Sequence, residues 1–330
     1  MLPIVSATRF SVLAIAASLA AAAVFTALDV VPAASQEAAL RAWQVDSADG
    51  LMDPWSSRWS DLKPAVVSLS AQNATKPLGG GEVATVKARS LQNGSTLYVM
   101  LEWKDKTKDM TVDGQTVFSD AAAVEMPAVG GTSIPSFCMG DVNGTVNIWH
   151  WKGVWQGDID SGFTSVRNRY PDGFVDEYPL KDDPAYQAAR AAGNALSQTS
   201  HASPVENLVA AGFGTLTTGD VQDVDGMGVW KDGRWRVVFS RPLTTATGYP
   251  TLAAGDSTNI AFAVWDGSKG NRDGLKSVSQ FMNLLVSTTP APAVAGGFPW
   301  WGWAIAAAIV ATAGISLAWA YRYSKAGTAA

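Results

Sequence analysis

Short runs that alternate apolar and polar residues constrain the fold of this 330-residue chain more than any other feature. In the run Thr-Val-Asn-Ile-Trp-His-Trp at 145–151, successive side chains would point to opposite faces of a strand. Comparable β-rich runs lie at 95–103, 121–126, 233–241, 259–265 and 280–286. Gly, Asp, Asn and Pro residues separate them, as in domains built from short antiparallel strands. The pattern predicts a mainly β chain folded as a β-sandwich.

A long stretch between these runs, 154–228, is rich in Gly, Asp, Ser and Asn. Within it, the Ala-rich segment 184–196 has helical propensity, although Gly193 weakens it. Long connections inside a compact domain are often functional. We therefore expect a sandwich with helical and loop insertions.

The N-terminus has the layout of a secretory signal peptide. Arg9 supplies a positive charge, an apolar run follows at 10–28, and small residues at 33–35 form a cleavage site. We expect 1–35 to be a signal peptide, with an uncleaved signal anchor as the alternative.

A second apolar run, 298–321, contains no charged residue. As a helix it would be about 36 Å long, enough to cross a bilayer core of roughly 30 Å. Aromatic residues mark both of its ends, and Arg322 and Lys325 follow it. The positive-inside rule then predicts a transmembrane helix with 322–330 as a cytoplasmic tail. A buried core helix is the alternative.

This arrangement divides the rest of the chain. Residues 36–287 would form the large domain, on the extracytoplasmic side of the cell membrane, and a Pro/Ala/Gly-rich linker would occupy 288–297. The expected topology is single-pass.

Composition excludes several classes of site. One Cys and two His rule out an intramolecular disulfide, a Cys-based zinc site, an iron–sulfur cluster and a c-type haem attachment. The net charge of −5 gives no footprint for nucleic acid. Neither Gly-x-Ser-x-Gly nor His-Glu-x-x-His occurs, although a glycosidase-like Asp/Glu pair stays open.

Methionine sulfur, lysine nitrogen and the two histidines are then the available redox ligands. Met139 lies in a loop bounded by Pro135 and Gly140, and Lys276 lies in the polar loop between two apolar strands. His150 stands between two tryptophans, where a packed histidine and a ligand are equally good interpretations. Taken alone, a Met is usually core and a Lys is usually solvated.

A set of motifs, in order along the chain, favours a ligand role for Met139 and Lys276. They are Ala-Val-Glu-Met-Pro at 123–127, Cys-Met-Gly at 138–140, Val-Asn-Ile-Trp-His-Trp-Lys at 146–152, Gly-Arg-Trp-Arg-Val-Val-Phe-Ser-Arg at 233–241, Ala-Phe-Ala-Val-Trp-Asp-Gly at 261–267 and Lys-Ser-Val-Ser at 276–279. Together they resemble the haem b-binding γ subunits of the ethylbenzene dehydrogenase and dimethylsulfide dehydrogenase family. The resemblance covers roughly residues 40–286.

The resemblance implies a β-sandwich that binds one haem b without a covalent bond. Carried over by motif, Met139 and Lys276 would be the axial ligands of the haem iron, with His150 as the substitute for Lys276. Phe137, Trp149, Trp151 and Trp265 are candidates for the walls of the haem site.

The same resemblance implies a role in transferring electrons between iron–sulfur and molybdenum subunits of an oxidoreductase complex and a respiratory chain. The chain would be an electron-transfer subunit rather than a catalytic one. The competing interpretation is a carbohydrate-binding β-sandwich on a membrane stalk, since exposed tryptophans can stack on sugar rings.

Overall fold

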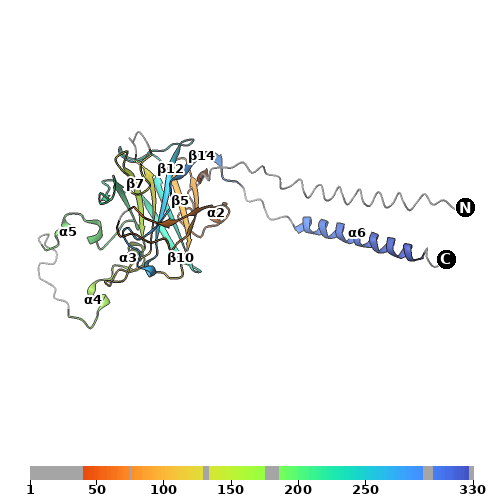
Figure 1. Cartoon of the computed structure of the whole chain (residues 1–330), viewed down its shortest axis with the longest axis horizontal. Helices are drawn as coiled ribbons and strands as arrows, with labels where there is room; N and C mark the ends of the chain where they lie inside the picture. Colours follow the sequence, from red (N-terminus) through yellow and green to blue (C-terminus); the bar gives the residue numbers. More distant parts are fainter. Residues whose placement is uncertain (1–39, 75, 129–133, 175–185, 293–299, 327–330) are drawn as a thin grey trace. The chain divides into compact units, whose positions relative to one another are not determined.

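The computed structural model describes residues 40–74, 76–128, 134–174, 186–292 and 300–326 (Figure 1). The expected signal peptide lies outside the described residues. Fourteen strands form one mixed sheet. They are β1 (Leu40–Gln44), β2 (Ala65–Ser68), β3 (Ser70–Ala71), β4 (Thr85–Gln92), β5 (Thr96–Lys104), β6 (Ala121–Pro127), β7 (Val146–Lys152), β8 (Val205–Ala210), β9 (Thr217–Thr218), β10 (Asp225–Lys231), β11 (Arg234–Pro242), β12 (Ser257–Trp265), β13 (Ser277–Val278) and β14 (Met282–Pro290).

The strand order is β10-β11-β5-β4-β1-β14-β12-β6-β7-β8-β9, with β2 on β4 and with β13 joining β12 to β3. All pairs are antiparallel except those of β1, which runs parallel to both β14 and β4. The β10–β11 hairpin turns at Asp232 and Gly233, which have φ values of 53° and 71°. This Asp-Gly pair has the positive φ angles that a tight hairpin turn requires.

Strand β12 belongs to both halves of the sheet, one from β10 to β14 and the other from β6 to β9 in the strand order. Its residues 257–260 pair with β14, and its residues 261–265 pair with β6. The two halves face each other, because Trp151 of β7 contacts Trp103 of β5 and Trp235 of β11, with ring centroids 6.4 and 5.0 Å apart. The main hydrophobic core lies between them and contains all three rings. The mainly β prediction is therefore confirmed.

The six runs expected as strands all lie in strands, namely β5, β6, β7, β11, β12 and β14. Strand β14 continues to Pro290, into the segment expected as linker. The other eight strands were not anticipated. β8, β9 and the start of β10 lie within 154–228, so part of the stretch expected as an insertion belongs to the sheet. In β4, Lys87 and Arg89 interrupt the apolar pattern, and their contacts with Glu102 explain them.

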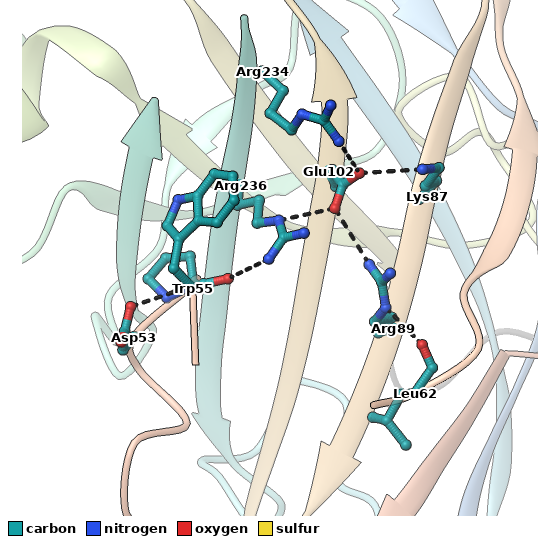
Figure 2. A network of polar contacts seen from close by, with 9 residues as sticks. Asp53, Trp55, Leu62, Lys87, Arg89, Glu102, Arg234 and Arg236 are labelled. Carbon is teal, nitrogen blue, oxygen red and sulfur yellow. Dashed lines mark hydrogen bonds and ion pairs between the residues drawn. The ribbon is translucent and has the colours of Figure 1, made fainter. Parts of the chain in front are cut away.

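Glu102 of β5 lies among four basic side chains on the face of β4, β5 and β11 that points away from the main core (Figure 2). Its Oε1 lies 3.2 Å from Lys87 Nζ and 3.4 Å from Arg234 Nη1. Its Oε2 lies 2.8 Å from Arg236 Nε and 3.6 Å from Arg89 Nη1. We call these five residues the Glu102 network.

Two of its guanidinium groups also hold the segment that covers this face. Arg89 Nε donates to the carbonyl oxygen of Leu62 at 2.9 Å, and Arg236 Nη1 donates to that of Pro54 at 3.4 Å (Figure 2). Trp59, in the short helix α2 (Ser57–Ser60), packs fully buried into a second apolar cluster there. The polar and apolar contacts together close this face.

The remaining helices are α3 (Gly153–Ser161), α4 (Val166–Arg169), α5 (Ala188–Ala191) and α6 (Trp300–Ala326), with single 3₁₀ turns η1 (Ala195–Ser197) and η2 (Gly267–Lys269). The expected helix at 184–196 is thus reduced to α5 and η1, with residues up to 185 outside the described part. The run expected to span a membrane lies largely in α6. Among the described residues, no helix has both the length and the apolar content that crossing a membrane requires.

Candidate functional site

A cavity of about 700 Å³ opens on the outer face of β6, β7 and β12. Its volume falls within the range of roughly 300–1,000 Å³ that is usual for small-molecule sites. Ile148 and His150 of β7 and Trp265 at the end of β12 form its floor, and Met139 and Lys276 reach it from two loops. The structure therefore brings together the three ligand candidates that the sequence offered.

Met139 has an unusual backbone conformation. Its φ is 70°, one of three positive values at non-glycine positions in the described chain. The conformation is held because Met139 O accepts from Gly212 N at 2.8 Å, and Gly140 N donates to Ser136 O at 2.9 Å. A side chain in this sparsely populated region costs free energy and is common at functional sites. The turn directs the thioether to the apolar cluster beside the cavity.

The backbone of Lys276 packs directly against the glycine turn at Gly80. The φ of Gly80 is +83°, and a Cβ at Gly80 would lie 2.3 Å from both the N and the O of Lys276. Lys276 Nζ lies 5.2 Å from the centre of the Trp265 ring. Burial lowers the pKa of Lys276, while the charge of Glu125 acts in the opposite direction. The Gly79-Gly80-Gly81 run was visible in the sequence, but its contact with Lys276 is long-range.

His150 has a buried, unpaired nitrogen. Its Nε2 has no hydrogen-bond partner, and its ring lies 4.9 Å from that of Trp265. Burial lowers the pKa of His150 well below its ordinary value, and the charges of Lys152 and Lys276 lower it further. The imidazole is therefore neutral at pH 7, the state in which histidine binds a metal.

A second cavity of about 30 Å³ lies behind Lys276 and Trp265 and is bordered by Glu125 and Phe137. It is large enough for a water molecule. Burial raises the pKa of Glu125 to about 8, against the opposing charge of Lys276 and a hydrogen bond from the Met139 backbone. Glu125 Oε1 has no partner. The sequence offered Glu125 only as part of a motif and did not predict its electrostatic interaction with Lys276.

The expected aromatic walls divide between two places. Trp265 borders both cavities, and its Nε1 donates to Asp273 O at 3.1 Å, which fixes the ring. Phe137 borders only the smaller cavity. Trp149 and Trp151 lie in the main core on the opposite face of β7. Because successive side chains alternate along a strand, they point away from the cavity that His150 lines.

Three basic side chains, those of Lys76, Lys152 and Arg272, line the cavity. Lys152 is already bonded to Glu206, whereas the Arg272 guanidinium lies 4.6 Å from the Phe118 ring centre. The cavity thus combines an apolar interior with cationic groups.

Comparison with known proteins points to one family. The family model described as "Ethylbenzene dehydrogenase" matches residues 56–277. The "Putative respiratory nitrate reductase heme subunit ORF7" of Haloferax mediterranei is 29% identical over 244 residues, which cover 73% of this chain and 71% of that protein. Chlorate reductase subunit gamma of Ideonella dechloratans is 31% identical, over 60% of this chain and 64% of its own.

Dimethylsulfide dehydrogenase subunit gamma of Rhodovulum sulfidophilum is 30% identical, over 59% of this chain and 58% of that protein. The match thus spans less than two thirds of either gamma subunit. Among solved structures, a family 9 carbohydrate-binding module from Caldicellulosiruptor kristjanssonii gives a TM-score of 0.39 at 10% identity, over 77% of this chain and 99% of that one. The sequence match over two thirds of its length shows that this chain belongs to the ethylbenzene dehydrogenase family.

Proposed function

We propose that this chain is a haem b subunit that transfers electrons within an oxidoreductase complex. The observation that carries the proposal is the convergence of Met139 and Lys276, from loops far apart in the sequence, on one cavity of about 700 Å³. The names of the relatives, which include a haem subunit and the gamma subunits of a reductase and a dehydrogenase, support the same function.

The residues around the cavity fit a haem. Met139 supplies a thioether, and Lys276 supplies an amine that must be neutral to bind iron. Deprotonating an ordinary lysine at pH 7 costs about 4–5 kcal/mol. Because burial lowers the pKa of Lys276, the fold reduces that cost. We assign the second axial position to Lys276 and keep His150, with its unpaired Nε2, as the alternative.

Other residues would bind and shield the group. Ile148 and Trp265 would pack on the porphyrin and exclude water, while Lys76 and Arg272 are suited to its carboxylates. A bound haem would supply one-electron chemistry, and a methionine ligand favours its ferrous form. With two protein ligands the iron would have no open position, so the site favours electron transfer over catalysis.

The wider setting is proposed from the sequence and the family. We propose iron–sulfur and molybdenum subunits as the partners, with electrons passing between them and a respiratory chain. We also propose export by the signal peptide 1–35 and anchoring by the apolar run 298–321, with the large domain on the extracytoplasmic side of the cell membrane.

Absorption spectroscopy tests haem binding and its ligands. The full-length protein, expressed with haem available, is expected to give a pyridine haemochrome of haem b and a low-spin spectrum. Met139→Ala and Lys276→Leu should lose haem or become high-spin. Two controls should keep the native spectrum: Met227→Ala, at an exposed position of β10, and Lys269→Leu, at an exposed position of the loop that carries Lys276.

Two results would change the proposal. A colourless protein, under conditions that supply haem, would contradict it. A native spectrum in Lys276→Leu together with a high-spin spectrum in His150→Leu would move the second ligand to His150.

The carbohydrate-binding alternative was based on exposed tryptophan rings. In the described strands and their connections, Trp59, Trp103, Trp149, Trp151 and Trp235 are fully buried. The one tryptophan among the exposed large apolar residues that the structure describes is Trp319, in α6. The burial of these rings therefore favours the haem interpretation.

A further inference from the structure

Three carboxylates meet beside the large cavity, at the ends of three strands. Asp105 follows β5, Asp120 precedes β6 and Asp266 follows β12. One oxygen from each lies within 4.8 Å of the others. The side chains are buried, with exposed fractions of 4%, 0% and 8%. Only Asp120 also lines the cavity itself.

This cluster has no cationic side chain to balance it. None of the ion pairs found among the described residues includes Asp105, Asp120 or Asp266. Burial, together with the charge of Asp105, raises the pKa of Asp120 to about 7. Burial also raises the pKa of Asp105, against a hydrogen bond from Thr107 and with a further rise from Asp266. Buried carboxylates in such proximity require either protons or a cation.

One oxygen of the cluster is buried and unpaired. Asp105 Oδ1 accepts from Thr107 N at 3.1 Å and from Thr107 Oγ1 at 3.2 Å. Asp105 Oδ2 has no partner with hydrogen-bond geometry. The indole N–H of Trp103 acts on this carboxyl as a donor that lowers its pKa, but Trp103 Nε1 makes no well-aligned bond either. A buried carboxylate oxygen without a well-aligned donor is costly, and a cation would satisfy it.

The other two carboxylates are held in position. Asp120 Oδ1 accepts from Gly267 N, and its Oδ2 accepts from Asp109 N and Trp235 Nε1, each at 2.8 Å. Asp266 Oδ1 accepts from Ser268 Oγ at 2.6 Å. Supporting hydrogen bonds of this kind orient metal-binding carboxylates. Asp120 Oδ1 and Asp266 Oδ1 accept one hydrogen bond each and keep a lone pair for a metal, whereas Asp120 Oδ2 accepts two.

We propose that Asp105, Asp120 and Asp266 bind one divalent cation of the Ca²⁺ type. Hard cations take oxygen ligands, and Ca²⁺ tolerates irregular geometry with carboxylates, carbonyls and water. The cation would replace the missing positive charge and occupy the unpaired oxygen of Asp105. It would also tie the ends of β5 and β12 to the start of β6.

The position of this site gives it a structural consequence. The loop that begins at Asp266 ends at Lys276, whose side chain lines the large cavity. A cation at Asp266 would therefore fix one end of the loop that carries Lys276. The proposal does not depend on haem, because the carboxylates and their hydrogen bonds belong to this chain alone.

Thermal unfolding of the full-length protein tests cation binding. After treatment with EDTA and its removal, CaCl₂ at about 100 times its Kd should favour the folded state about 100-fold. For a domain of this size the midpoint should rise by about 5–10 °C. Asp266→Asn should abolish most of that rise. Asp172→Asn, which removes one exposed negative charge elsewhere, should keep it.

Terbium luminescence reports binding at the site directly, and its competition with CaCl₂ can be measured on the wild-type protein. Because Trp235 Nε1 bonds to Asp120, TbCl₃ bound there should emit on excitation of tryptophan, and CaCl₂ should compete. Emission that CaCl₂ does not displace, or that Asp266→Asn leaves unchanged, would overturn the proposal. So would a midpoint that CaCl₂ does not raise but that lower pH does, since the carboxylates would then share protons instead.

Discussion

The outer faces of the two halves of the sheet handle polar groups in opposite ways. On the face of β4, β5 and β11, Glu102 is surrounded by four basic side chains and covered by the segment that carries Trp59 (Figure 2). On the face of β6, β7 and β12, His150 Nε2 and Glu125 Oε1 are buried without partners beside a large cavity. The charged groups of the first face are paired within the chain, although Arg89 Nη1 and Trp55 Nε1 make no hydrogen bond there. On the second face, His150 and Glu125 border cavities that have room for a ligand or a water molecule.

The largest effect is expected from removing the negative charge at the centre of the Glu102 network, which tests whether these ion pairs stabilise the first face. Glu102→Gln would leave the buried guanidinium groups of Arg89 and Arg236 without a counter-charge. We expect a loss of about 3–5 kcal/mol in the free energy of unfolding. Urea unfolding of the haem-free protein measures it, with Lys104→Gln at the exposed end of β5 as the control. A loss below about 1 kcal/mol would mean that the network does not stabilise this face.

The two faces also predict opposite pH dependences. The basic neighbours lower the pKa of Glu102 despite its burial, so its contribution is present at neutral pH and is lost as pH falls through the acid range. The pKa of Asp120 is raised to about 7, so the folded state binds the proton more tightly than the unfolded state. Its contribution is present below about pH 4 and is lost as pH rises to about 7.

The size of the second effect follows from the shift. Between pH 4 and pH 7 the haem-free protein in EDTA should lose about 4 kcal/mol from Asp120. Asp120→Asn should reduce the slope of the stability curve between pH 4 and pH 7, where Glu125, whose pKa is raised to about 8, still contributes. Glu102→Gln should instead flatten the acid limb. Urea unfolding at a series of pH values measures both. Equal slopes in wild type and Asp120→Asn would contradict the assignment.

A smaller loss is expected where the cavity face depends on a close backbone contact. In Gly80→Ala the added methyl would meet the backbone of Lys276 at 2.3 Å, at a φ that disfavours alanine. We expect a loss of about 1–3 kcal/mol in stability and weaker haem binding. Gly94→Ala, also at a positive φ but with no atom within 4 Å of the new Cβ, is the matched control. If both variants bind haem alike, Gly80 does not position Lys276.

The smallest effect should come from the unpaired histidine. His150→Leu removes a buried nitrogen that makes no hydrogen bond, so the haem-free protein should change in stability by less than about 1 kcal/mol. The opposite face of β7 provides the comparison, because Trp149→Ala should cost about 3–5 kcal/mol. A large loss in His150→Leu would show that His150 is a core residue after all.

For the predicted strands, the sequence indicated which side chains share a face. It did not indicate which face packs against the core and which borders the cavity. Alternation along 145–151 correctly separated His150 from Trp149 and Trp151. It could not show which face meets the main core, so Trp149 was assigned to the haem site and instead donates its Nε1 to Asn147 Oδ1 inside the core. That distinction depends on which strands lie opposite, and these come from distant parts of the chain.

The site itself was accessible only through resemblance. Met139 and Lys276 lie 137 positions apart, and no local pattern places them beside one cavity. Strand β4 was not recognised because of its charged residues Lys87 and Arg89. Their partner Glu102 lies on the neighbouring strand β5, and the sequence does not show that the two strands pair. The carboxylate cluster was also invisible, since its members follow or precede three separate strands.

The most direct test of the haem site is a titration of the haem-free, full-length protein with haem b, monitored by absorption. We predict one haem per chain with a low-spin spectrum, retained in the double control Met227→Ala/Lys269→Leu. In Met139→Ala/Lys276→Leu, haem binding should be lost or the complex should become high-spin. An unchanged low-spin complex in that last variant, or no binding to the wild-type protein, would contradict haem ligation by Met139 and Lys276.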